Sequence, residues 1–232
     1  MPALKSRTAV RFASLHAAYG DCAVVRFWQS DDGLLLYAIG GTLHIASFGA
    51  FDKEGLAAFV DWLGFARIYC PETLAESMGW QKHEQVLELE QTQSCCGAVS
   101  KTELKLPEIY NVFAGSGGAI EMPPFADFCV DLSHRLRHGG GRYVGDLQGI
   151  AMTDAETKAF AHIGGVAVLP EYRALGLGSR LLQGLCAELQ SEGKTVLTST
   201  TAPLLPFYQK NGFAVYKRCC YCTPDKINRS ST

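Results

Sequence analysis

The sequence has no long run of large apolar side chains and no excess of charge of either sign. Its 232 residues include 21 Lys and Arg against 23 Asp and Glu, a formal net charge of −2. This balance leaves no broad basic surface, so we expect neither a nucleic-acid partner nor a membrane partner. Apolar residues make up 47% of the chain and charged residues 19%, the mixture of a globular protein rather than a disordered one.

The N-terminal residues also do not predict a secretory leader. The first eleven residues carry Lys5, Arg7 and Arg11 but no apolar segment. We interpret the first 20 residues, which contain no acidic side chain, as an ordinary first strand, with a transit peptide as the alternative. Residues 33–51 contain no charged side chain, but four glycines interrupt them, and Gly40-Gly41 indicates a two-residue hairpin rather than a membrane span. The predicted location is cytoplasmic.

Nine cysteines are many for a chain without such a leader. Cys219, Cys220 and Cys222, and the pair Cys95-Cys96, raise the question of a metal site. Adjacent residues of a strand point to opposite faces, which argues against neighbouring cysteines converging on one ion. We therefore interpret the cysteines as reduced, mostly buried thiols and predict no metal, with a metal site as the alternative.

The most informative segment runs from Val166 to Ser179. An apolar, strand-like stretch ends at Pro170, the loop Arg-x-x-Gly-x-Gly follows at 173–178, and an amphipathic helical pattern occupies 179–192. Glycines let the backbone turn sharply and approach a ligand, so that successive N–H groups point at one anion. The N-terminus of the helix adds free N–H groups and partial positive charge. Strand, loop and helix together predict a pyrophosphate-binding site.

Two common phosphate-binding loops do not fit this segment. The dinucleotide fingerprint needs a third glycine three residues after the second, and here Arg180 and Leu181 follow with no glycine before Gly184. A Walker loop needs Lys before its Ser or Thr, whereas Gly178 directly precedes Ser179.

The pattern instead resembles the GNAT superfamily of N-acetyltransferases. Members carry Gln/Arg-x-x-Gly-x-Gly/Ala after a Val-x-Val strand, as at 166–178, and a Tyr-x-x-x-Gly-Phe helix end, as at 208–213. The resemblance covers residues 160–216 and extends through the flanking elements towards residue 125. It implies acetyl-CoA as co-substrate, no metal, and a mixed α/β fold with a mostly antiparallel sheet flanked by helices.

The resemblance also implies a cofactor-binding set. Main-chain groups of the strand would pair with the pantetheine arm, and N–H groups of the loop would bind the pyrophosphate. The paired glycines Gly164-Gly165 fit the bulge that splays this strand in family members. The set comprises Val166, Ala167, Val168, Arg173, Ala174, Leu175, Gly176, Leu177, Gly178, Ser179 and Thr201.

Two residues are candidates for the chemistry. Tyr208 matches the family tyrosine that protonates the CoA thiolate, with a core tyrosine as the alternative. His162 stands where many members place an acidic general base, and an unperturbed histidine pKa of ~6.5 suits that role. A structural histidine at the start of a strand is the alternative. Asp154 and Glu156, in a predicted turn before that strand, are weaker candidates that we interpret as solvated.

The sequence departs from the family pattern at two positions. Ala174 replaces the glycine that commonly follows the loop Arg, and Thr201 stands where many members have an Asn that contacts the CoA arm. A threonine hydroxyl keeps one hydrogen bond of that amide but cannot reproduce its geometry. For Arg173 itself, a phosphate contact and a solvated surface position are both open.

The predicted elements repeat in order. Three strands, a helix from Asp52, a strand at 66–70, a helix at 71–78 and a strand at 86–89 match the later half, with Gly79-Trp80 in the place of Gly212-Phe213. We predict two domains: residues 1–95 as a degenerate GNAT-like half without the CoA loop, and residues 96–232 as the acetyl-CoA-binding domain.

The predicted function is transfer of an acetyl group from acetyl-CoA to a primary amine by direct attack. The acceptor, a small molecule or a peptide, is not identified by any residue pattern, and a homodimer is compatible with the sequence. The alternatives are a catalytically decayed CoA-binding or regulatory protein and a purely structural scaffold of two halves.

Overall fold

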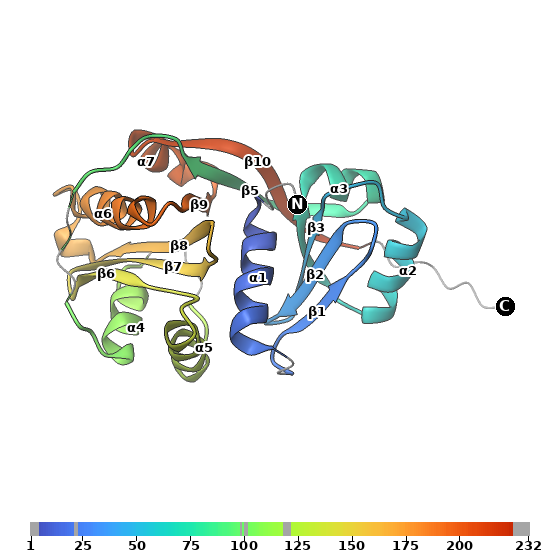
Figure 1. Cartoon of the computed structure of the whole chain (residues 1–232), viewed down its shortest axis with the longest axis horizontal. Coiled ribbons are helices and arrows are strands. Elements are labelled where there is room, and N and C mark those ends of the chain that lie inside the picture. Colours follow the sequence, from blue (N-terminus) through green and yellow to red (C-terminus); the bar gives the residue numbers. More distant parts are fainter. Residues whose placement is uncertain (1–4, 21–22, 98, 100–101, 118–121, 225–232) are drawn as a thin grey trace.

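The computed structural model describes residues 5–20, 23–97, 99, 102–117 and 122–224. One ten-stranded sheet crosses the molecule, and helices pack against it (Figure 1). The N-terminal half contains α1 (Arg7–Tyr19), β1 (Arg26–Gln29), β2 (Leu34–Ile39), β3 (Thr42–Ser47), α2 (Lys53–Leu63), β4 (Arg67–Pro71), α3 (Glu72–Met78) and β5 (Gln81–Gln91). The C-terminal half contains α4 (Leu106–Gly115), α5 (Phe125–Arg137), β6 (Tyr143–Asp146), β7 (Gly149–Glu156), β8 (Phe160–Val168), α6 (Leu177–Ser191), β9 (Thr195–Thr200), α7 (Leu205–Lys210) and β10 (Phe213–Thr223).

The sheet has the order β1-β2-β3-β4-β10-β5-β9-β8-β7-β6. Its pairs are antiparallel except β3 with β4 and β8 with β9, which are parallel. In each parallel pair a helix connects the two strands, α2 in the first and α6 in the second, as parallel crossovers require. The predicted fold class, a mixed α/β fold with a mostly antiparallel sheet and flanking helices, is confirmed.

Residues 5–20, the described part of the N-terminal segment, contain no strand, so the predicted first strand was wrong there. Residues 7–19 form α1, and Ser6 caps it because its Oγ accepts a hydrogen bond of 3.1 Å from the Ala9 N–H. Val10, Ser14 and Leu15 lie on its buried face, followed by Ala18. This spacing of three to four residues belongs to a helix, so the periodicity of the apolar positions outweighs the basic residues among them.

The two halves exchange their last strands. β10 of the C-terminal half lies between β4 and β5, and β5 of the N-terminal half lies between β10 and β9. β5 and β10 pair from Phe213 with Gln91 to Thr223 with Gln81, along the length of both strands. In Figure 1 these two strands bridge the halves. Each half therefore lacks a strand that the other half supplies.

The element order of the two halves repeats as predicted, from three strands through helix, strand and helix to the exchanged strand. Gly79 follows α3 and Gly212 lies just after the end of α7. Their φ values of +70° and +87° favour glycine. The aromatic residue that follows, Trp80 or Phe213, is buried in the core of its half. The boundary between residues 95 and 96 stays a prediction, because the halves share one sheet.

Side chains of the C-terminal half alternate between two cores. Ala151, Ile163 and Val166 face α6, whereas Ile150 and Ala167 face α4 and α5. α1 contacts β2 and β3 of one half and β7 and β8 of the other, so it lies across the middle of the sheet (Figure 1). Among the described residues, no helix is long and apolar enough to span a membrane.

Candidate acetyl-CoA site

β8 and β9 separate partway along their length. Their pairing runs from Phe160 with Thr195 to Ile163 with Thr198. Beyond that point Gly164–Val168 continues along β7, while β9 continues along β5 as far as Thr200. The Thr198 hydroxyl donates a 2.9 Å hydrogen bond to the Ile163 carbonyl, which holds the two strands together where they diverge. The divergence leaves one side of β8 without a neighbouring strand.

A double irregularity between β7 and β8 produces this shape. The register shifts after Met152 and again after Thr153, so Asp154 and Gly164 are each unpaired in the ladder. A Cβ atom on Gly164 would lie 2.5 Å from the Asp154 Cβ, so only glycine fits at this point. The bulge expected from the paired glycines is therefore present, and the Asp154 side chain crosses it.

The main chain of Val166 and Val168 is directed to the open side. The Leu169 N–H donates to the Gln148 carbonyl of the β7 side at 3.0 Å. Hydrogen-bonded and non-hydrogen-bonded pairs alternate along an antiparallel ladder, so Val168 and Val166 direct their N–H and C=O groups away from β7. Both residues are half-buried. This edge can pair with an extended amide-containing ligand.

The predicted loop joins this strand to α6 by an exposed path. Ala174 has φ of +61° and Gly176 φ of +76°, and Gly176 caps α6 without a side-chain hydrogen bond. Within the described residues, no protein acceptor is recorded for the N–H groups of residues 174–179. These N–H groups and the helix N-terminus are the groups that an anion would use.

The Arg173 side chain folds back onto the protein. Its Nε donates to the Val168 carbonyl at 3.1 Å, and its Nη2 donates to the Ser116 carbonyl at the end of α4. The guanidinium therefore ties the loop to β8 and to α4. Arg173 is exposed, as the surface alternative expected, but its guanidinium is hydrogen-bonded to main-chain carbonyls rather than free.

Tyr208 of α7 lies in the core on the α6 side. Its ring contacts Phe207 and Phe213 at 5.2 and 5.7 Å between centroids, and 7% of the residue is exposed. Burial raises the pKa of Tyr208, and hydrogen bonding with Thr198 opposes only part of that rise. The phenol is thus protonated at neutral pH and linked to the residue at which β8 and β9 diverge.

His162 lies on the opposite face of the sheet, towards α1. Its Nδ1 lies 2.6 Å from Asp154 Oδ1, and Asp154 Oδ2 accepts a 2.9 Å hydrogen bond from Arg11 of α1. Burial opposes ionisation of Asp154, but its interactions with His162 and Arg11 outweigh burial and hold its pKa well below the ordinary value. The carboxylate is ionised, so Nδ1 carries the proton, and the buried Nε2 has no protein partner among the described residues.

The interpretation of Asp154 and Glu156 as solvated turn residues was wrong. β7 extends to Glu156, so both residues lie in a strand rather than in a turn. Glu156 is 6% exposed and accepts hydrogen bonds from Arg142 at 2.7 and 2.9 Å and from Lys194 at 2.6 Å. Glu156 therefore ties β7 to its surroundings by ion pairs, whereas Asp154 orients His162.

Two functional neighbours were missed in the sequence. Asn211 Nδ2 donates to Ser179 Oγ at 3.2 Å and to the Phe207 carbonyl at 2.8 Å, which joins α7 to the first turn of α6. Arg11 reaches Asp154 from a helix 143 residues earlier in the chain. Local spacing gave no signal for Arg11, whereas Asn211 stands within the recognised Tyr-x-x-x-Gly-Phe pattern.

Thr201 follows β9 and begins a short 3₁₀ turn over Ala202–Leu204. Its carbonyl accepts from the Leu204 N–H at 3.1 Å, and its side chain is half-buried. The segments that meet around the divergence of β8 and β9 thus include the loop, the open edge of β8, Thr201 and Tyr208. His162 approaches the same divergence from the other face.

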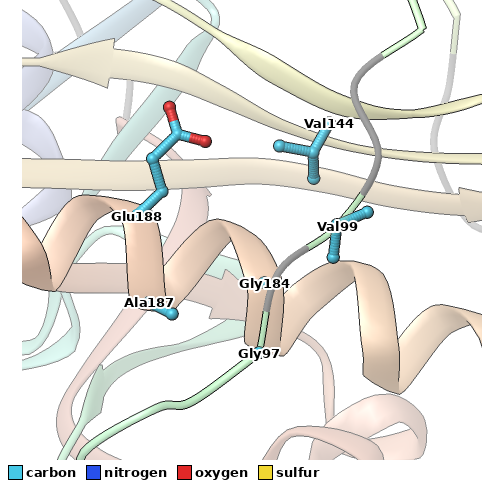
Figure 2. Close-up of a pocket in the computed structure, with 6 residues that line it drawn as sticks. All are labelled: Gly97, Val99, Val144, Gly184, Ala187 and Glu188. Atoms are coloured by element: carbon cyan, nitrogen blue, oxygen red, sulfur yellow. The ribbon is translucent and has the colours of Figure 1, made fainter.

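A separate hollow of about 340 Å³ lies beside α6 (Figure 2). It is lined by Gly97, Val99, Val144, Gly184, Ala187 and Glu188. None of the predicted site residues contributes to it. Glu188, its charged residue, already accepts a 2.9 Å hydrogen bond from Arg142. The hollow is not the candidate site.

Known sequences identify the type of domain. Residues 128–215 match the model of the acetyltransferase (GNAT) domain. Glucosamine 6-phosphate N-acetyltransferase of Trypanosoma brucei brucei is 43% identical over 63 residues, which cover 26% of this chain and 42% of that protein. The match thus spans less than half the length of the relative.

Solved structures resemble the chain along most of its length. A tandem GNAT protein from the clavulanic acid biosynthesis pathway has a TM-score of 0.61 at 13% identity, with 93% of this chain and 87% of that chain covered. A GCN5-related N-acetyltransferase from Kribbella flavida has a TM-score of 0.60 at 15% identity, with 94% and 95% covered. These likenesses show the fold. Residues 128–215 thus match the domain of the family that the sequence predicted, and that family is one of acyltransferases.

Proposed function

We propose that this chain transfers an acetyl group from acetyl-CoA to a primary amine by direct attack. The observation that carries the proposal is the open edge of β8 at Gly164–Val168, which leads into a loop and helix N-terminus with free N–H groups. Family membership of residues 128–215 supports the same reaction.

Cofactor binding would use main-chain groups. N–H groups of residues 174–179 would bind the pyrophosphate, and the helix N-terminus would add partial positive charge. Val166 and Val168 would pair with the pantetheine amides, and an N–H of this edge would stabilise the oxyanion of the attacked thioester. Arg173 would act indirectly by holding the loop against β8.

The two proton transfers of the reaction would take place on opposite faces of the sheet. A primary amine is mostly protonated at neutral pH, so the attacking form needs a base. His162 Nε2 would accept the amine proton, because Asp154 holds the proton of the same ring on Nδ1. Tyr208, on the other face, would donate its proton to the departing thiolate.

The acceptor class follows from the relative and is the finer part of the proposal. We infer a small-molecule amine, and an amino sugar phosphate is the first substrate to test, since the Trypanosoma relative is named for glucosamine 6-phosphate. The N-terminal half, which we propose as a degenerate GNAT-like domain over residues 1–95, would form a wall of the acceptor site through α1. Polyamines, amino acids and peptides are the other acceptors to compare.

The cofactor site is tested by calorimetry with acetyl-CoA on two variants of nearly equal shape. Ser179→Asp places a negative charge among the loop N–H groups, and Ser179→Asn places a neutral amide there. We expect the Asp variant to bind at least about tenfold more weakly than the Asn variant, because like charges repel at short range. Equal affinities would contradict phosphate binding at this loop.

A second candidate is a CoA-binding protein without turnover. The observation in its favour is that His162 is 1% exposed, so an acceptor reaches it only through a movement of its surroundings or through a water molecule. A thiol-release assay separates the two functions. Acetyl-CoA binding without release of CoA for any amine would favour this second function.

A further inference from the structure

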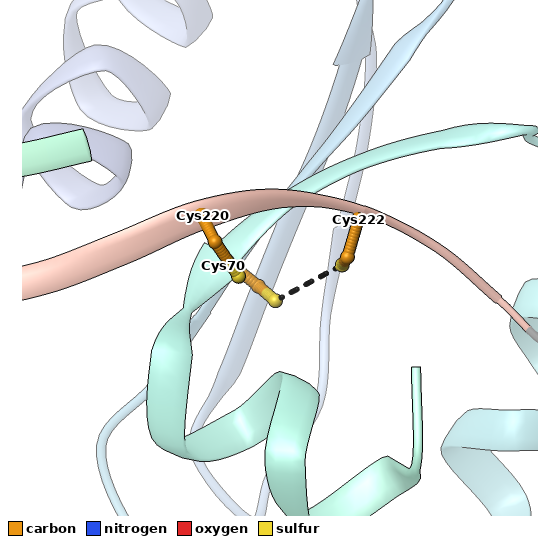
Figure 3. A group of neighbouring side chains, drawn as sticks. All are labelled: Cys70, Cys220 and Cys222. Carbon is orange, nitrogen blue, oxygen red and sulfur yellow. Dashed lines mark hydrogen bonds between the residues drawn. The ribbon is translucent and has the colours of Figure 1, made fainter. Parts of the chain in front are cut away.

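Three cysteines from two strands converge beneath α3. Cys70 lies on β4, and Cys220 and Cys222 lie on β10. Their sulfur atoms all lie within 4.8 Å of one another, and Cys70 Sγ is 3.7 Å from Cys222 Sγ (Figure 3). Cys220 is paired directly with Cys70 across the strands, and Cys222 is paired with Ile68. The register of β4 and β10 therefore holds the three thiols together.

Side chains alternate between the two faces of a strand, which argues against adjacent cysteines as ligands of one ion. The same alternation brings cysteines two residues apart to one face. Cys220 and Cys222 are two residues apart and share one face of β10, whereas Cys219 points to the other face and contacts Glu88 at 3.2 Å. No local pattern indicated Cys70, which lies 150 residues before Cys220 in the chain and joins the other two cysteines only through strand exchange.

The surroundings of the thiols are apolar. Leu74, Ala75 and Trp80 are buried in the same core as the three cysteines, each of which is at most 1% exposed. No His, Asp, Glu or fourth Cys among the described residues joins the group. A metal bound here would have sulfur ligands from three side chains and little access to water.

We propose that Cys70, Cys220 and Cys222 bind one thiophilic metal ion, with Cu(I) as the preferred ion. Thiolates select soft ions, and Cu(I) accepts three sulfur ligands without a fourth donor. Metal–sulfur bonds of ~2.3 Å in a trigonal plane separate the sulfurs by ~4.0 Å, close to the 3.7 Å between the sulfurs of Cys70 and Cys222. Each thiol that bonds to the ion releases its proton to solvent, and no oxidation or reduction of the cysteines is involved.

The ion would join the two halves of the molecule. β4 belongs to the N-terminal half and β10 is the strand that the C-terminal half inserts beside it. An ion bonded to both strands would oppose withdrawal of β10. The expected role is thus stabilisation of the exchanged strand, independent of acetyl transfer.

The test titrates the reduced full-length protein with Cu(I) under anaerobic conditions against the chelator bicinchoninate. We expect one equivalent of tight binding and a rise in melting temperature. Cys220→Ser and Cys222→Ser should each weaken Cu(I) binding at least tenfold, whereas Cys219→Ser, the neighbour on the opposite face, should bind as the unmodified protein does. Absence of a tight equivalent, or loss of it in Cys219→Ser alone, would overturn the proposal.

A measurement on the unmodified protein keeps the proposal testable if the serine variants do not fold. X-ray absorption of the Cu(I)-loaded protein should show three sulfur neighbours. Cd²⁺, a second probe, should give a sulfur-to-metal charge-transfer band of one equivalent in the ultraviolet. Nitrogen or oxygen ligands in the copper spectrum, or fewer than three sulfurs, would overturn the trigonal site.

Discussion

At the scale of single residues, the proposed chemistry separates onto two faces of the sheet. Tyr208 lies among the apolar side chains beneath α6, and His162 lies beside Asp154 and α1. Thr198 connects them, since its hydroxyl holds the Ile163 carbonyl next to His162 and its side chain hydrogen-bonds with Tyr208. The acid and the base would therefore approach one thioester from opposite sides, which keeps their protons apart.

Replacement of Tyr208 by Phe tests the proton donor. We expect kcat to fall by about 10²-fold or more with little change in KM, because a positioned general acid contributes about 10²–10⁴-fold. Burial raises the pKa of Tyr208 above 10.0, so the unmodified protein should keep its activity to that pH. Steady-state kinetics with a thiol-release readout measures both quantities. Tyr110→Phe, at a half-buried tyrosine of α4, is the control, and equal rates in the two variants would contradict the role.

Asp154→Asn tests the orientation of His162. Loss of the carboxylate leaves Arg11 without its partner, so we expect the free energy of unfolding at pH 7 to fall by about 1–3 kcal/mol. The pKa of Asp154 is lowered on folding, so its contribution is present above its ordinary value of 3.8 and is lost as pH falls through the folded value. The difference between the two proteins, measured by urea unfolding, should thus shrink below pH 4. A difference that grows in acid would contradict the ion pair.

At the scale of elements, the sequence predicted most helices and strands but not their exact ends. α3 matches the helix predicted at 71–78 to within one residue, because Gly79 ends it with a positive φ that favours glycine. β5 is longer than expected, since its polar half, Gln81–Gln85, is a strand only through pairing with β10. α1 was missed because its buried face packs against both halves, and the triad of Arg11, Asp154 and His162 depends on that packing.

The bulge of β8 gives the prediction at this scale. Gly164→Ala would place a Cβ atom 2.5 Å from the Asp154 Cβ, and two backbones must move to relieve the overlap. We expect a loss of about 2 kcal/mol or more in unfolding free energy, as overpacking of a close contact produces. Gly178→Ala is the control for stability, because a Cβ there meets Val168 at an ordinary 3.5 Å. Similar stabilities of the two variants, measured in urea, would show that the bulge tolerates a side chain.

At the scale of the whole molecule, the exchange of strands makes each half depend on the other. β4 and β9 each pair with a strand from the opposite half, and removal of that strand would expose an unpaired edge and the apolar side chains behind it. The repeated order of strands and helices could be recognised in the sequence, but the strand exchange could not. The alternation of side chains along a strand shows which face is buried, and it does not identify the strand that pairs with it.

Separate production of residues 1–95 and 96–232 tests this dependence and the predicted domain boundary together. Circular dichroism and size exclusion should show that each fragment alone is unfolded or aggregated. Fragment 1–95 lacks β10, which lies between β4 and β5, and fragment 96–232 lacks β5, which lies between β10 and β9. Produced together, the fragments should form a complex of one copy each, and only that complex should bind acetyl-CoA, because β5 supports β9 along the side of the proposed site. A monomeric, folded fragment 96–232 with the acetyl-CoA affinity of the full chain would contradict the dependence, and the N-terminal half would then be dispensable for the cofactor site.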